Sequence, residues 1–143
     1  MSAPSEADWS AALSVLDGAD EVALACHVGP DGDALGSMLA LAIGLRRLGK
    51  RTIASWGSRP FRVPPQYAYL PVDGMLTDPD EFPEAPALMV TFDTGSAERL
   101  GTLEPAAAKA GTLVVVDHHA SNTAYGDVNL LDPGAAASAV LVA

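Results

Sequence analysis

The sequence contains a single cysteine, Cys26, so no intrachain disulfide can form. Cys26 lies inside an apolar run, which favours a core side chain over a nucleophile. No apolar run approaches the roughly 18 residues that a membrane-spanning helix needs. Residues 1–6 lack the basic start of a secretory signal. These absences argue against a disulfide-stapled secreted domain and a membrane protein, and we expect a globular cytoplasmic protein.

Basic residues are also scarce. Eight Lys and Arg stand against 18 Asp and Glu, which gives a net charge of −10. Such a charge disfavours a surface that grips nucleic-acid phosphates, unless bound cations neutralise part of it. Six of the basic residues lie between positions 46 and 62. The four nearest the predicted helix, up to Arg51, are interpreted as a solvated helix end, whereas a substrate role for Arg59 and Arg62 stays open. The segment holds Arg46, Arg47, Lys50, Arg51, Arg59 and Arg62.

Apolar residues are plentiful, at 49% of the 143 residues, and suffice for the core of one domain. Short, continuous apolar runs of this kind are typical of strands that are buried on both faces of a sheet. Strands are predicted at residues 21–27, 51–56, 87–92 and 112–116, with a short edge strand at 128–131.

Helical patterns alternate with these runs. A buried helix is predicted over residues 34–48, with Gly49 following its end. Residues 57–86 are predicted to be mostly loop. The alternation indicates an α/β fold, a mainly parallel sheet with helices on both faces in a Rossmann-like three-layer arrangement. Further helical segments are predicted around residues 9–16, within 97–110 with breaks near Gly101 and Pro105, and from about Gly134.

Three of the predicted strands stop at residue types that bind metals. His27 ends the first, Asp93 follows the third, and Asp117-His118-His119 follows the fourth. Ligands of open parallel sheets bind beyond the carboxyl ends of the strands, so these side chains are expected in one crevice.

The loop after the first strand adds two carboxylates, Asp31 and Asp33. Mixed carboxylate and imidazole ligands suit Mn²⁺, Zn²⁺ or Fe²⁺ better than Mg²⁺, and several carboxylates allow one to bridge two cations. Each residue alone has a structural interpretation: Asp33 as a helix N-cap, Asp31-Gly32 as a turn, Asp93 as an Asx-turn. Their coincidence at strand ends favours a metal site.

Three segments match the motifs of a known family. His27-Val28-Gly29-Pro30-Asp31-Gly32-Asp33-Ala34-Leu35-Gly36-Ser37 resembles the first motif of the DHH phosphoesterases. Thr91-Phe92-Asp93-Thr94 resembles the second motif, and Asp117-His118-His119 is similar to the triplet that names the family. The order and rough spacing agree from about residue 21 to residue 143, so the resemblance covers nearly the whole chain.

The wording of the motifs points to one branch of that family. A histidine at the start of the first motif speaks against the RecJ-type exonucleases. Manganese pyrophosphatases share the ligand plan, but the segment from Pro30 to Ser37 and the later sequences resemble the nanoRNase/pAp-phosphatase branch more closely. The later sequences are His119-Ala120-Ser121-Asn122 and Asp132-Pro133.

The resemblance implies a role for each matching residue. His27 and Asp31 would hold one divalent metal, Asp33 and His118 a second, and Asp93 would bridge the two, with Mn²⁺ the expected ion. The catalytic residues would be Asp93, His118 and His119, with His119 facing the substrate phosphate. Further candidates are Asp117, which would orient its neighbours, and Ser37 and Asn122, which would contact the substrate or the ligands.

The resemblance also implies a substrate class and a missing part. The branch hydrolyses short oligoribonucleotides, adenosine 3′,5′-bisphosphate and, in some members, linear or cyclic dinucleotides. The domain organisation follows from the same resemblance. Residues 1–19 are expected to be a helical lead-in, and residues 20–143 are expected to be a DHH catalytic domain. Neither Asp127 nor Asp132 fits the family's fourth-motif aspartate, and the DHHA1 domain is absent, so the chain is interpreted as the front part of a larger enzyme. Alternatives are a manganese pyrophosphatase and an inert truncated module, and homodimerisation is left open.

Overall fold

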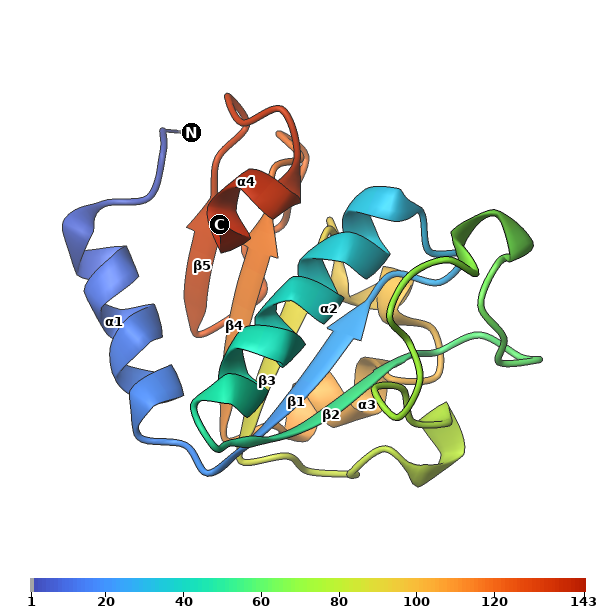
Figure 1. Cartoon of the computed structure of the whole chain (residues 1–143). Helices are drawn as coiled ribbons and strands as arrows, with labels where there is room; N and C mark the ends of the chain where they lie inside the picture. The colour runs from blue at the N-terminus through green and yellow to red at the C-terminus, as the bar shows by residue number, and fades with distance from the viewer. Residues whose placement is uncertain (1) are drawn as a thin grey trace.

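Five parallel strands form the centre of the computed structural model, which describes residues 2–143 (Figure 1). Their order across the sheet is β2-β1-β3-β4-β5. All neighbouring pairs are parallel, as the continuous apolar runs predicted. The strands are β1 (Glu21–Cys26), β2 (Arg51–Trp56), β3 (Leu88–Phe92), β4 (Thr112–Asp117) and β5 (Val128–Leu131).

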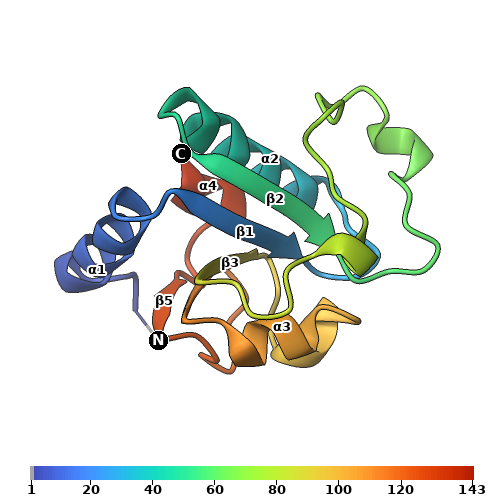
Figure 2. The same cartoon turned by 90° about the horizontal axis from the view of Figure 1, so that it is seen from below.

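Helices cover both faces of the sheet, so the predicted three-layer α/β arrangement is confirmed. Figures 1 and 2 show α2 on one face and α3 on the other. The face beneath α2 also contacts the first and last helices, and the opposite face contacts η3 and α3. The bounds are α1 (Glu6–Asp17), α2 (Gly32–Arg47), η3 (Ala97–Leu100), α3 (Glu104–Lys109) and α4 (Ser138–Val142).

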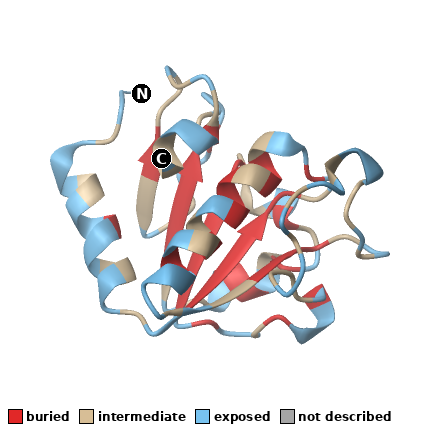
Figure 3. Ribbon diagram, viewed as in Figure 1, coloured by how far each residue is buried: buried red, intermediate tan, exposed pale blue. Residues whose placement is uncertain are grey.

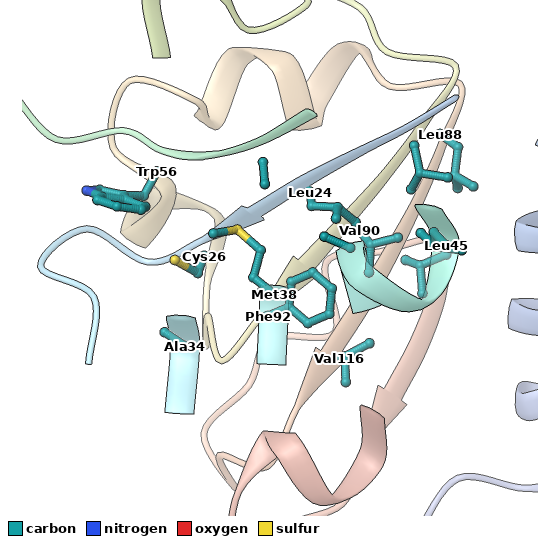
Figure 4. Close-up of a cluster of buried hydrophobic side chains, with 14 of the residues drawn as sticks. Leu24, Cys26, Ala34, Met38, Leu45, Trp56, Leu88, Val90, Phe92 and Val116 are labelled. Carbon is teal, nitrogen blue, oxygen red and sulfur yellow. The ribbon is translucent and has the colours of Figure 1, made fainter. Parts of the chain in front are cut away.

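Alternate residues of each strand supply the two halves of the core. Leu24 and Cys26 of β1 pack with Phe92 and Met38 beneath α2 (Figure 4), whereas Ala25 faces the side of α3. Buried residues therefore fill the central strands in Figure 3. Cys26 is fully buried in this core, as predicted, and burial raises the pKa of its thiol above the usual range.

Helix α2 begins two residues earlier than predicted. Asp31, not Asp33, is its N-cap, because the Asp31 carboxylate accepts the backbone N–H of Ala34 at 2.9 Å. Asp33 lies inside the first turn instead. At the other end Gly49 follows the helix with a φ of 81°, a left-handed conformation that glycine adopts without strain, as predicted.

Two other predicted boundaries are wrong. Pro105 does not interrupt a helix: it is the second residue of α3, where a missing N–H costs nothing. Helix α4 begins at Ser138 and not near Gly134, because Asp132 accepts the N–H of Gly134 at 2.9 Å and forms a turn there. The break at Gly101 and the mostly irregular 57–86 segment, with only two short 3-10 helices at Pro65–Tyr67 and Pro79–Glu81, agree with the prediction. Among residues 2–143 there is no helix with the length and apolar character to cross a membrane.

Candidate metal centre

The sheet order fixes where the strand-end residues meet. β1 and β3 are neighbours, but the chain leaves β1 toward α2 on one face and leaves β3 toward η3 on the other. Such a switch point opens a crevice at the carboxyl ends of the strands. His27 follows β1, Asp93 follows β3, and Asp117 ends the adjacent β4, so the structure brings these three to the same crevice.

Asp93 lies at the middle of this crevice and is almost completely buried. Its Oδ2 is 3.5 Å from Nε2 of His27, whereas its Oδ1 is 3.3 Å from Nε2 of His118. Oδ1 also lies 3.6 Å from Nδ1 of His119, so His27 faces one oxygen of Asp93, and His118 and His119 face the other. The backbone of Asp93 has a φ of 57°, an uncommon conformation for a residue with a side chain and one often found at functional sites.

The first group of donors consists of His27, Asp31 and Asp93, whose ligand atoms all lie within 4.8 Å of one another. Nε2 of His27 is 3.7 Å from Oδ2 of Asp31. Nδ1 of the same ring is 2.7 Å from the carbonyl oxygen of Val28, so an N–H there leaves Nε2 for a cation. Hydrogen bonding to Asp93 raises the pKa of His27 against the opposing effect of burial, so a cation has to compete with a proton at this ring.

The second group consists of His118, Asp33 and Asp93. Nε2 of His118 is 3.5 Å from Oδ2 of Asp33 and 3.3 Å from Oδ1 of Asp93. Burial alone raises the pKa of Asp33, but the backbone N–H groups of Ser138 and Ala139 outweigh it, and the net effect is a lowered pKa. Asp33 is therefore held in the ionised form that a cation binds.

Asp117 is fully buried, and protein groups occupy both of its oxygens. Oδ1 accepts the backbone N–H of His118 at 2.8 Å and lies 2.7 Å from Nδ1 of His119. Oδ2 accepts the side-chain amide of Asn122 at 2.7 Å. Asp117 also lies within 4.8 Å of Asp93, His118 and His119 as an alternative ligand set. Asp33 also accepts three donors, but its Oδ2 lies 3.5 Å from Nε2 of His118, whereas the fully buried Asp117 contacts the backbone N–H of that residue, so Asp33 is the better candidate ligand beside His118.

Ser37 and Asn122 are both buried beside these carboxylates. The Ser37 hydroxyl donates to Oδ1 of Asp33 at 3.3 Å. Besides Asp117, the Asn122 amide donates to the carbonyl oxygen of Thr94 at 3.2 Å, which ties the loop after β4 to the loop after β3. In this arrangement both side chains contact proposed ligands or their neighbours.

A cavity of about 390 Å³ opens beside the first group of donors. Arg99 is the one Lys or Arg among its lining residues, and sequence reasoning missed it. In the sequence, Arg99 is marked only by lying shortly after Asp93, and its neighbours share that feature. The half-exposed His119 also lines this cavity. The lining comprises His27, Asp31, Asp93, Gly95, Ser96, Arg99, His119 and Ser121.

The other basic residues lie elsewhere. Arg46 and Arg47 are in the last turn of α2, which fits their interpretation as a helix end. The amino group of Lys50 donates to the carbonyl oxygen of Ala19 at 2.6 Å. Arg59 forms an exposed salt bridge with Asp80, and neither Arg59 nor Arg62 lines the cavity.

The chain is similar to proteins of known families. Residues 21–143 match the model of the DHH family, N-terminal domain. The chain is 34% identical over 119 residues to the bifunctional oligoribonuclease and PAP phosphatase NrnA of Thermus thermophilus. This alignment covers 83% of the present chain and 34% of the relative. The chain thus spans about a third of the length of the curated relative that it matches.

A solved structure shares the fold. The chain superimposes on an exopolyphosphatase-related protein from Bacteroides fragilis with a TM-score of 0.82. The overlap covers 96% of this chain and 42% of that protein, at 21% sequence identity. An identity this low supports the likeness of the fold alone.

Proposed function

This chain belongs to the DHH family, and we propose that it is the catalytic domain of a divalent-metal-dependent phosphoesterase for short oligoribonucleotides or adenosine 3′,5′-bisphosphate. One observation carries the proposal: Oδ2 of Asp93 faces His27 and Oδ1 faces His118, and each of these two imidazoles has a further carboxylate beside it. The likeness to NrnA of Thermus thermophilus supports this choice of substrates.

The donor atoms fit a pair of cations. His27 and Asp31 would hold one, Asp33 and His118 the other, and Asp93 would be shared between them. Imidazole and carboxylate together favour Mn²⁺ over Mg²⁺. When bound, the cations would supply Lewis-acid charge at the phosphoryl group and lower the pKa of an attacking water.

The chain's own residues would position the substrate around them. Asp117 fixes the ring of His119 through Nδ1, and the ring lines the cavity, where it could donate from Nε2 to a phosphoryl oxygen only as an imidazolium with both nitrogens protonated. Asn122 holds Asp117 from the other side, and Ser37 holds Asp33. Arg99 supplies a positive charge at the cavity wall for a phosphate group of the substrate.

The proposal is tested by incubating the 143-residue chain with adenosine 3′,5′-bisphosphate, a 5′-phosphorylated diribonucleotide or pyrophosphate. Each substrate is offered with Mn²⁺ and with EDTA, and released phosphate or mononucleotide is measured. Hydrolysis of a nucleotide substrate with Mn²⁺ alone is the expected result. Hydrolysis of pyrophosphate alone would instead identify a pyrophosphatase. If Mn²⁺ binds but no substrate is cleaved, this chain is an inert module and the proposal fails for it.

Arg99→Ala is expected to raise KM for adenosine 3′,5′-bisphosphate by about 10-fold or more and to change kcat much less. A hydrogen bond to a charged group is worth roughly 1.5–3 kcal/mol, and this one is made before as well as during the reaction. Arg47→Ala is the matched control, because it removes the same charge in the last turn of α2, away from the cavity. Equal KM values for the two variants would exclude a substrate contact by Arg99.

A further inference from the structure

Ser138 brings a fourth strand end to the metal centre. It is the first residue of α4, follows β5 and is fully buried. Its hydroxyl donates to Oδ1 of Asp93 at 3.2 Å, and its backbone N–H donates to Oδ2 of Asp33 at 2.9 Å. One residue thus joins two carboxylates that come from the connections after β1 and β3.

Both of these contacts fall on the same group of donors. Oδ1 of Asp93 and Oδ2 of Asp33 are the two oxygens that face His118. The oxygens near His27 are Oδ2 of Asp93 and Oδ2 of Asp31, and Ser138 has no hydrogen bond with either of them. Ser138 therefore distinguishes the two groups.

Helix formation does not account for the hydroxyl. A serine near a helix start commonly caps the helix by accepting a backbone N–H, but the N-cap of α4 is Ala137, and the Asp33 carboxylate accepts the first two free N–H groups of the helix. The hydroxyl instead points away from α4 to Asp93. Burying a hydroxyl is costly unless it is hydrogen-bonded, and here Asp93 supplies the acceptor.

We propose that Ser138 is a positioning residue for the cation held by Asp33, His118 and Asp93, and not for the cation held by His27 and Asp31. The proposal rests on the metal centre of the proposed function. The hydroxyl orients Asp93 so that Oδ1 faces His118, and the backbone N–H orients Asp33 toward the same point. Ser138→Ala removes the first of these contacts and leaves the second.

The test is a Mn²⁺ titration of the 143-residue chain by calorimetry, with no substrate present. In Ser138→Ala one of the two binding steps is expected to weaken about 10-fold, the usual lower bound for loss of a partner of a metal ligand. The other step is expected to stay within about twofold. Ser138→Cys keeps the side-chain shape with a weaker donor and is expected to lie between the wild type and Ser138→Ala.

Ser55→Ala is the matched control. Ser55 is an equally buried serine in β2 whose hydroxyl has no hydrogen-bond partner, so its removal deletes the same atom without touching the centre. Both Mn²⁺ steps should be unchanged in Ser55→Ala, and thermal unfolding in EDTA establishes that every variant is folded.

Two results would overturn the proposal: unchanged affinities in both Ser138 variants, or equal weakening of both steps, which would indicate a general structural role. A wild-type chain that binds no Mn²⁺ would overturn the metal centre as well. A chain that binds two ions but cleaves no substrate would refute the proposed function while leaving the role of Ser138 intact.

Discussion

Replacing Asp93 with asparagine is expected to lower kcat/KM for the preferred nucleotide by more than about 100-fold, the upper bound for losing a residue that only supports a metal ligand. The amide replaces one carboxylate oxygen with a donor, so one of the two imidazole–carboxylate groups loses an acceptor whichever way the amide turns. The loss of negative charge weakens the attraction for both cations. Steady-state kinetics with Mn²⁺ at several concentrations measure the effect.

Asparagine removes the charge of Asp93 but is compatible with its backbone conformation, so a loss of activity would not reflect misfolding. Asp93 has a left-handed backbone with a φ of 57°, which asparagine tolerates better than alanine does. The control is Asp73→Asn, which makes the same substitution at an exposed aspartate outside the cavity lining. Activity of Asp93→Asn within about twofold of the control would show that Asp93 bridges no cations.

The sheet and the crevice were predictable from sequence because their signal repeats. The strands β1, β3 and β4 are mainly apolar runs, and all three end at metal-binding residue types, so the prediction does not depend on any single residue. The DHH resemblance, which rested on three motifs in one order, is confirmed by the family match over residues 21–143. The position of Asp93 between His27 and His118 follows from β1 and β3 being neighbours.

The parts that sequence reasoning missed have a weak local signal. The start of α4 depends on a turn made by Asp132, and Ser138 lies in a run of small residues where nothing marks it as different. Its contact with Asp93 spans 45 positions of the sequence and is set by the packing of α4 against the sheet. The position of Arg99 at the cavity wall depends likewise on how the η3 segment packs, and no periodic pattern in the sequence predicts that packing.

Gly57 determines much of that packing. It follows β2 and forms an isolated parallel bridge with Gly101, just after η3. A Cβ at position 57 would lie 2.2 Å from the carbonyl oxygen of Leu100 and 2.5 Å from the backbone nitrogen of Thr102. Because both neighbours are backbone atoms, no side-chain rotation can relieve the clash. Arg99 comes two residues before Gly101, and its carbonyl oxygen accepts the backbone N–H of Val28 at 2.9 Å, which connects η3 to the end of β1.

Gly57→Ala is therefore expected to lower the free energy of unfolding by about 3 kcal/mol or more, at or beyond the upper end for overpacking of a tight interior. The measurement is urea unfolding followed by circular dichroism.

Gly44→Ala is the matched control. Gly44 lies on the exposed side of α2, and no atom lies near the position of an added Cβ. The same methyl should therefore raise the stability by up to about 1 kcal/mol. If both variants changed stability by less than about 0.5 kcal/mol, the close approach of Gly57 to the η3 segment would not exist in solution. Opposite signs from one added methyl would establish that approach and support the position of the η3 segment, which brings Arg99 to the cavity wall.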